Sequence, residues 1–133
     1  MTSYWNHNTA YHRELVNAVP VRRPAPAAGD ALDPNGVNDA ASHRGPVTVL
    51  DIGCGDGLLV RKLSATCASV TGIDPNVTAT PPTIQSATFD DFSPNQFFDT
   101  IIFVASLHHM DMRCALTKAK NMLRPDGQIL VVG

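Results

Sequence analysis

The chain lacks several features that define other classes of protein. No uninterrupted apolar run reaches the roughly 20 residues of a membrane-spanning helix. Residues 1–7 contain no basic region followed by an apolar stretch, so we expect no secretory signal. The formal net charge of −2 provides no basic surface for nucleic acid or an anionic membrane. We therefore expect neither nucleic acid nor a membrane among its partners.

Cysteine is scarce, with only Cys54, Cys67 and Cys114 in the chain. An odd number of widely separated cysteines argues against a disulfide framework and for a reducing compartment, so we expect a cytoplasmic protein. Their spacing matches no zinc-binding pattern, and we expect no metal site. The length of 133 residues suffices for one domain with a modest core.

The most informative stretch is residues 49–57, VLDIGCGDG. An apolar run leads into Asp51 and then into three glycines on alternate positions, from Gly53 to Gly57, before the helix-like run 58–63. This order predicts a buried strand, a tight turn and a helix. Glycines serve where a backbone turns sharply and a ligand comes close. Open α/β sheets bind ligands at such a turn, at the carboxyl end of a strand.

The spacing of the glycines bears on the kind of ligand. A dinucleotide site prefers Gly-x-Gly-x-x-Gly, but Leu58 occupies the place of its last glycine and Gly57 comes one residue early. Asp51 would repel a pyrophosphate, whereas it suits a ligand that carries an ammonium or sulfonium group. A purely structural turn remains an alternative for the glycines alone.

A second acid follows at the distance that a nucleoside site requires. Residues 69–74, SVTGID, predict a strand that ends in Asp74. An acid about 20 residues beyond the glycine turn can accept both ribose hydroxyls of a nucleoside. The alternative is a strand-end aspartate that begins a turn with Pro75.

Together these motifs resemble the class I S-adenosylmethionine (SAM)-dependent methyltransferases of the small-molecule type. Four motifs carry the resemblance, at residues 51–57, 72–75, 98–110 and 123–130. The last is similar to the family's turn before its fifth strand, with Asp126 in place of a usual glycine. The resemblance covers residues 47–133.

The expected fold is α/β, with a Rossmann-like, doubly wound parallel sheet in the family's strand order 3-2-1-4-5. The apolar patterns predict strands at residues 47–52, 70–74, 84–89, 100–105 and 128–132, and helices at 8–19, 56–66 and 112–123. Tyr11, Leu15 and Val19 form the predicted inward face of the first helix.

The chain divides into three expected parts. Residues 1–20 form a helix that, by the resemblance, lies over the cofactor pocket; packing on the sheet edge is the alternative. Residues 21–46 are rich in proline and glycine and predict a linker or disordered loop. Residues 47–133 form the SAM-binding Rossmann-like core.

Two departures from the family are visible. Only nine residues separate Asp74 from Ile84, and three are proline, so we expect a turn or irregular loop in place of the family's second helix. The family's sheet usually includes a sixth and a seventh strand. We expect a chain truncated after strand five, with an open edge that invites pairing into a homo-oligomer.

The resemblance assigns the first group of site residues. Backbone groups of Gly53, Cys54 and Gly55 approach the methionine end of SAM, and Asp51 engages its ammonium or bonds the amides of the loop. Asp74 holds the ribose, and Pro75 offers apolar contact to adenine. Cys54 is expected to be a small turn residue rather than a nucleophile.

The resemblance also places site residues after the third and fourth strands. Asp91 or Asp90 accepts a hydrogen bond from the adenine amino group, and Phe92 packs on adenine; the alternative is a doubled acid in a solvated turn. A backbone carbonyl of Ala105 or Ser106 faces the sulfonium.

Two histidines are candidates for a catalytic role. His108 and His109 could act as a general base, because an unperturbed imidazole titrates near neutrality. The alternative is that one of them is structural and Asp111 caps the following helix. Adjacent histidines point apart, which argues against a shared metal.

The predicted function is SAM-dependent methylation of a small-molecule acceptor by in-line displacement. One alternative is a SAM- or nucleoside-binding remnant without turnover that acts through assembly. An NAD(P)-dependent oxidoreductase is a further alternative, disfavoured by Leu58 and Asp51.

Overall fold

The computed structural model describes residues 7–20, 46–66, 68–77 and 82–133. The expected linker at 21–46 lies almost wholly outside the described residues. The helical elements are η1 His7–Tyr11, α1 His12–Ala18, α2 Leu58–Ser64, η2 Leu107–His109 and α3 Met112–Met122. The strands are β1 Thr48–Ile52, β2 Ser69–Ile73, β3 Ile84–Gln85, β4 Phe98–Val104 and β5 Leu123–Val132.

The strands form one parallel sheet in the order β3-β2-β1-β4-β5, which confirms the predicted topology. At the carboxyl end of β1, Ile52 pairs with Ile73 of β2 and with Phe103 of β4. The loops that follow these three strands therefore meet at one edge of the sheet. Within the described residues β5 pairs only with β4, so β3 and β5 are the two edge strands of the sheet.

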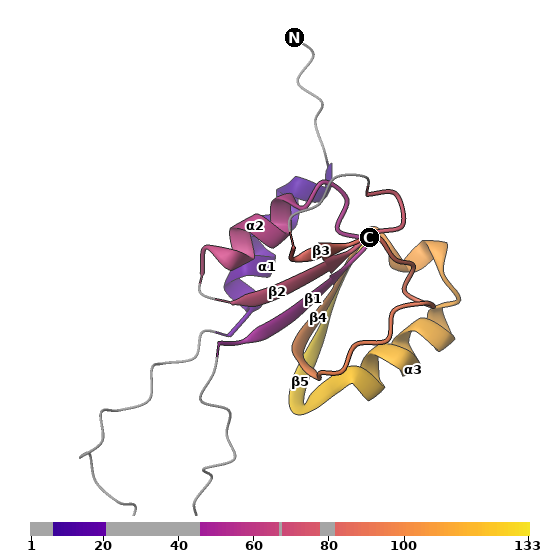
Figure 1. The fold of residues 1–133 in the computed structure, drawn as a ribbon. Coiled ribbons are helices and arrows are strands. Elements are labelled where there is room, and N and C mark those ends of the chain that lie inside the picture. The colour runs from indigo at the N-terminus through magenta and orange to yellow at the C-terminus, as the bar shows by residue number, and fades with distance from the viewer. Residues whose placement is uncertain (1–6, 21–45, 67, 78–81) are drawn as a thin grey trace, which may run out of the picture.

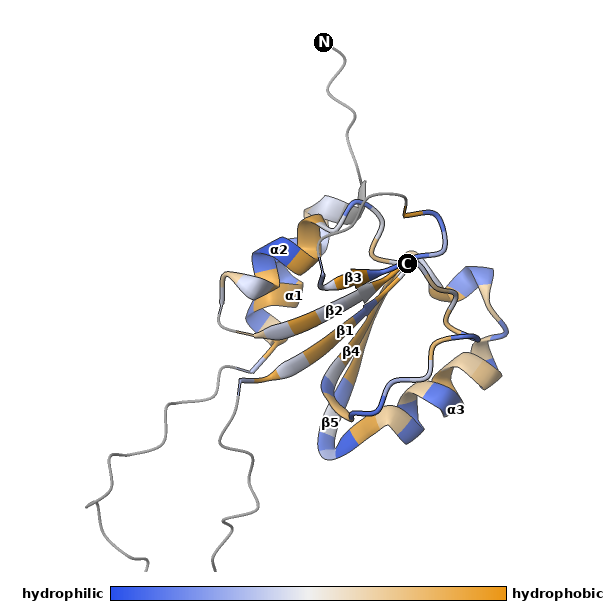
Figure 2. Ribbon diagram, viewed as in Figure 1, coloured by the Kyte–Doolittle hydropathy of each residue, from blue (hydrophilic) through white to orange (hydrophobic). Residues whose placement is uncertain are grey.

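Helices cover both faces of the sheet, with α1 and α2 on one side and α3 on the other (Figure 1). All five residues of β1 are buried, as expected of a central parallel strand. Alternate side chains of β1 enter two cores: Val49 packs with α1 and α2, and Leu50 packs with α3. Apolar residues accordingly dominate the central strands in Figure 2.

The N-terminal segment differs from its prediction. A 3-10 turn precedes α1, which begins only at His12. Leu15 and Val19 are buried as predicted, but Tyr11 is 51% exposed. His12 takes the inward position instead, with 6% exposure. The spacing of His12, Leu15 and Val19 also follows one helical face.

The third strand is shorter than predicted, because only Ile84 and Gln85 pair with β2. The following residues use their polar groups in a local turn. The Thr88 hydroxyl donates to Asp91 Oδ2 at 2.9 Å and accepts from the Asp91 amide at 3.2 Å. Such side chain–backbone bonds compete with a strand ladder.

The second helix also begins later than predicted, at Leu58 rather than Asp56. Gly57 precedes it in a left-handed conformation, and the Leu58 amide donates to Asp56 Oδ1 at 3.0 Å. Leu59 and Leu63 face the core. None of the helices in the part of the chain described here is long and apolar enough to cross a membrane.

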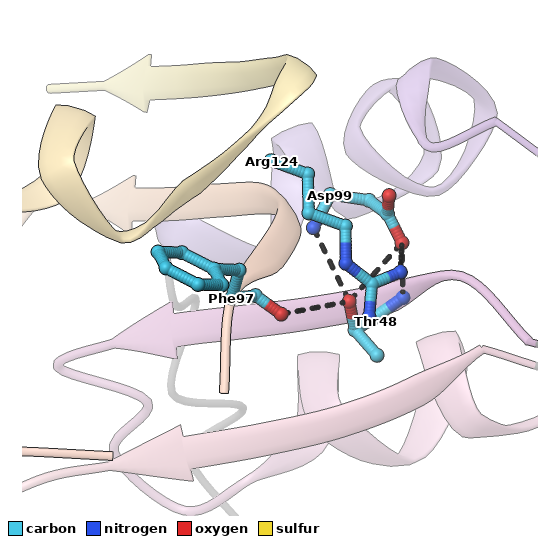
Figure 3. A network of polar contacts seen from close by, with 4 residues as sticks. All are labelled: Thr48, Phe97, Asp99 and Arg124. Carbon is cyan, nitrogen blue, oxygen red and sulfur yellow. Dashed lines mark hydrogen bonds and ion pairs between the residues drawn. The ribbon is translucent and has the colours of Figure 1, made fainter. Parts of the chain in front are cut away.

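A polar network joins the strands at the amino end of β1 (Figure 3). Asp99 Oδ2 accepts from the Thr48 amide at 2.9 Å and from its hydroxyl at 3.1 Å, and Arg124 Nη1 lies 3.3 Å away. The Asp99 amide donates back to Thr48 Oγ1 at 3.2 Å. The network therefore links β1, β4 and β5 at the end opposite to the glycine turn.

Candidate functional site

The glycine turn after β1 is fastened to the end of β2. The amides of Gly53 and Cys54 both donate to the Ile73 carbonyl, at 2.8 and 3.0 Å. Gly53 has a φ of +76°, and a Cβ there would lie 2.7 Å from the Cβ of Ser106. A side chain at this position is therefore excluded twice, by backbone conformation and by contact.

Gly55 differs from Gly53 in its surroundings. Its φ is also positive, at +56°, but a Cβ there would meet no atom of the described residues within 4 Å. The space above Gly55 is open, so a ligand can approach the backbone of the turn at this point.

Asp74 connects the two predicted motifs. Its Oδ2 accepts from the Gly55 amide at 3.0 Å, and its Oδ1 accepts from the Asn76 amide at 2.8 Å. The bond from the Asn76 amide closes a turn after β2, as expected if Asp74 is a strand-end aspartate that begins a turn with Pro75. Each carboxylate oxygen has two lone pairs, so these amides leave acceptor capacity for a pair of hydroxyls.

Asp51 is the most unusual acid of the site. It lies in β1 with 2% exposure. Burial, and then the negative charge of Asp74, raise its pKa to about 7. Both causes disfavour the ionised carboxyl, and a cation beside Asp51 would relieve both.

The turn borders a pocket of about 280 Å³. It is lined by His12, Asp51, Gly53, Cys54, Gly55, Asp56, Leu59 and Val104. Four of these are predicted site residues: Asp51, Gly53, Cys54 and Gly55. The others are His12 of α1, Asp56 of the glycine turn, Leu59 of α2 and Val104 at the end of β4.

Cys54 is a structural member of this site. Its side chain is buried, and burial together with Asp51 and Asp74 raises the pKa of its thiol to about 12. The thiol therefore stays protonated near neutrality and is a poor nucleophile.

The end of β4 packs directly against the glycine turn. The Ser106 hydroxyl is buried and donates to the Ile52 carbonyl at 2.7 Å. Ala105 has a φ of +49°, which is costly for a residue with a Cβ. The Ser106 carbonyl accepts from the His109 amide at 3.1 Å, which leaves one of its lone pairs. The carbonyls of Ala105 and Ser106 therefore both stay candidates.

The predicted adenine residues do not line the glycine-turn pocket. Asp91 and Phe92 border a second pocket of about 540 Å³, together with Thr71 and Gln85. Asp90 is exposed, whereas the Phe92 side chain is buried in the core beside α3. Pro75 is exposed on the turn after β2.

Lys118 of α3 supports the turn that carries these acids. Its ammonium donates to the carbonyl of Phe89 and, at 3.0 Å, to that of Asp90. It also lies 4.8 Å from the centre of the Phe89 ring, a cation–π distance.

The two histidines after β4 lie outside the glycine-turn pocket. His108 and His109 are exposed in η2, and their ring centres lie only 4.0 Å apart. The expectation that the two side chains point apart is therefore wrong. Asp111 caps α3, since its Oδ1 accepts from the Cys114 amide at 2.9 Å. This capping agrees with the structural alternative. The contacts among residues 7–20, 46–66, 68–77 and 82–133 do not test a catalytic role for either histidine.

Sequence reasoning missed four residues of this pocket: His12, Asp56, Leu59 and Val104. For His12 a signal was present, because the N-terminal segment is dense in aromatic and imidazole groups. His12 Nδ1 lies 3.2 Å from Nζ of Lys62, so the imidazole joins α1 to α2.

The sequence and the fold resemble those of known methyltransferases. A model of the methyltransferase-domain family matches residues 4–132. An uncharacterized methyltransferase of Mycobacterium tuberculosis is 33% identical over 106 residues, which cover 71% of this chain and 54% of that protein. The ubiquinone biosynthesis O-methyltransferase of Bradyrhizobium diazoefficiens is 32% identical over 100 residues, which cover 65% of this chain and 40% of that protein. The chain thus spans about half the length of the curated relatives it matches, or less.

Two solved structures share the fold. The plantazolicin methyltransferase BpumL, in complex with a triazolic desmethylPZN analogue and S-adenosylhomocysteine (SAH), has a TM-score of 0.54 at 23% identity, over 65% of this chain and 38% of that chain. The Burkholderia thailandensis 1,6-didemethyltoxoflavin-N1-methyltransferase, with 1,6-didemethyltoxoflavin and SAH bound, has a TM-score of 0.56 at 22% identity, over 65% of this chain and 44% of that chain. With the family match over nearly its whole length, this chain belongs to the methyltransferase-domain family.

Proposed function

We propose that this chain binds SAM in the pocket beside the glycine turn and transfers its methyl group to a small-molecule acceptor. The observation that carries the proposal is the pairing of an open glycine backbone at Gly55 with two acids, Asp51 and Asp74, at one sheet edge. The SAH bound to the two solved relatives named above supports the same cofactor.

The residues present fit the groups of SAM. Asp51 is buried and its pKa is raised to about 7, so a neighbouring cation such as the ammonium of the methionyl moiety would favour its ionised form. Asp74 offers remaining lone pairs to the ribose hydroxyls. The backbone carbonyl of Ala105 or Ser106 would face the sulfonium. Asp90, Asp91, Phe92 and Pro75 remain the candidates for adenine, because they follow β3 and β2 at the same sheet edge.

The role of the protein in this chemistry is alignment. Bound SAM supplies a methyl group on a sulfonium, whose thioether leaves readily when an acceptor nucleophile attacks in line. The glycine turn, Asp51 and Asp74 hold the methyl group in one place. Such positioning contributes up to roughly 7–11 kcal/mol in well-oriented systems. His108 and His109 remain candidates for a base where the acceptor must lose a proton.

A small-molecule acceptor agrees with the names of the relatives. One acts in ubiquinone biosynthesis and another was solved with 1,6-didemethyltoxoflavin. The net charge of −2 offers no basic surface for a nucleic-acid substrate.

The second candidate is SAM binding without turnover. It draws on one observation, that the chain spans only 54% of the mycobacterial relative. If the acceptor site of such relatives is built by the part that the match does not cover, these 133 residues would bind the cofactor without turnover.

Calorimetric titration of the 133-residue chain with SAM and SAH tests the proposal. We expect binding that Asp74→Ala weakens by tenfold or more. Asp126→Ala, which removes an exposed acid of β5, is the matched control and should bind normally. A folded wild-type chain that binds neither nucleoside would overturn the proposal.

Turnover separates the two candidates. The chain is incubated with SAM carrying an isotopically labelled methyl group and a panel of phenolic, amine and heteroaromatic acceptors. Label in an acceptor supports the enzyme, whereas SAM binding with no labelled product across the panel supports the binding remnant.

A further inference from the structure

His12 lies in the glycine-turn pocket, and the proposed contacts with SAM do not involve it. It is the first residue of α1, it is 6% exposed, and it lines the pocket together with Asp51 and Asp56. Its Nδ1 lies 3.2 Å from the ammonium of Lys62 on α2. An ammonium has only protons to offer, so His12 Nδ1 is the acceptor in this bond.

That bond determines which nitrogen of His12 carries the proton. With Nδ1 accepting, the neutral imidazole bears its hydrogen on Nε2. Burial, and then the charge of Lys62, lower the pKa of His12 against an opposing effect of Asp56, so the ring is neutral near pH 7. His12 is therefore a fixed donor rather than a base ready to accept a proton.

The pocket is chemically two-sided as a result. Asp51 and Asp56 contribute acids, which suit a cation. His12, with Lys62 behind it, contributes a donor polarised by a positive charge, which suits an anion. An amino acid moiety carries both charges on one carbon atom, and it matches this arrangement better than a simple cation does.

We propose that His12 donates a hydrogen bond from Nε2–H to the carboxylate of the methionyl moiety of SAM, and that Lys62 acts as a positioning residue that holds this tautomer. The inference rests on the proposed function, since it assigns a residue to one group of the same ligand. It also gives α1 a role beyond packing: the helix that buries Leu15 and Val19 delivers a ligand contact.

The test compares two ligands that differ only in the carboxylate. SAH carries it, and decarboxylated SAH keeps the ammonium, ribose and adenine. We expect the wild-type chain to bind SAH roughly 10- to 100-fold more tightly, as a hydrogen bond to a charged group implies. In His12→Phe this preference should fall to within about threefold of unity. His12→Gln places an amide donor near the position of Nε2 and should restore part of the preference.

Two further variants separate the named contact from general effects. Lys62→Gln should reduce the preference without abolishing it, because the imidazole remains. Arg13→Gln removes an exposed cation one residue away and should leave the preference unchanged. Circular dichroism of each variant establishes that it is folded.

The outcomes distinguish the inference from the function on which it rests. A folded wild-type chain that binds neither ligand overturns both. A wild-type chain that binds SAH and decarboxylated SAH equally overturns the role of His12 and leaves SAM binding intact. The same holds if His12→Phe keeps the full preference for SAH, or lowers the affinity for both ligands by the same factor.

Discussion

The charge of Asp74 reaches the buried carboxyl of Asp51 and adds to the effect of burial in raising the pKa of Asp51 to about 7. Burial is the larger cause. In the ligand-free chain Asp51 is therefore close to half-protonated at neutral pH, while Asp74 is held by two backbone amides. A cationic ligand beside Asp51 favours its ionised form and lowers its pKa.

The affinity for SAH should therefore fall as the pH falls below about 7. Binding in that range must displace the proton of Asp51, which costs up to tenfold in Kd per pH unit. Calorimetry between pH 5.5 and 7.5, in buffers of different ionisation enthalpy, measures both the affinity and the released proton. Asp51→Asn should bind more weakly at pH 7.5 and show a flatter profile. Because the pKa of His12 also affects binding in this pocket, the dependence of Kd on pH in the wild type alone would not isolate Asp51. An equal slope in the wild type and in Asp51→Asn would contradict the role of Asp51.

Ionisation of Asp51, which favours ligand binding, should lower the stability of the folded chain. The pKa of Asp51 is raised from 3.8 to about 7 on folding, so the folded state binds its proton more tightly than the unfolded state does. The free energy of unfolding should fall between about pH 4 and pH 7 through this group, and the loss is complete above pH 7. Asp51→Asn should therefore be more stable than the wild type at pH 8, by a few kcal/mol, without ligand.

Urea unfolding at pH 5 and at pH 8 measures this difference. Asp126→Asn changes an exposed acid and serves as the control. If Asp51→Asn is less stable relative to the wild type at pH 8 than it is at pH 5, the proposed ionisation of Asp51 is wrong.

Gly53 and Gly55 should respond differently to alanine, although both have positive φ. In Gly53→Ala the new Cβ meets Ser106 at 2.7 Å, so contact adds to the backbone cost of about 1–2 kcal/mol and the variant should unfold readily. In Gly55→Ala only the backbone cost applies. Its methyl group points into the open space, and Kd for SAH should rise at least tenfold. Thermal unfolding and SAH titration of both variants test this. Wild-type affinity in Gly55→Ala would show that the ligand does not approach there.

Much of the fold was predictable because its signals are local. The apolar run into Asp51, the alternate glycines and the strand ending in Asp74 each specify one element and its end. Parallel order follows from strands that alternate with helices. Asp51, Gly53, Cys54 and Gly55 share a pocket because the turn brings neighbouring residues together.

The remainder depends on contacts that no local pattern contains. By its pattern, the first helix could bury either Tyr11 or His12 beside Leu15 and Val19. The structure buries His12, which contacts Lys62, 50 residues away in the chain. The third strand shortens because Thr88 bonds Asp91 rather than extending the ladder. The same turn places Asp91 at a different pocket from Asp51.

The polar network at the amino end of β1 should contribute to stability and not to ligand binding. Thr48→Val keeps the shape and the β-branch but removes the hydroxyl that donates to Asp99 Oδ2 and accepts from the Asp99 amide. The partly buried Asp99 groups lose these bonds, which should cost about 1–3 kcal/mol in the free energy of unfolding. SAH affinity should stay within threefold, because Thr48 begins β1 and the glycine turn follows its other end. Thr117→Val, on the exposed surface of α3, is the matched control and should change stability by less than about 0.5 kcal/mol. Equal stability of the two variants in urea would show that the network contributes nothing, and a large change in SAH affinity would show that the two ends of the sheet are coupled.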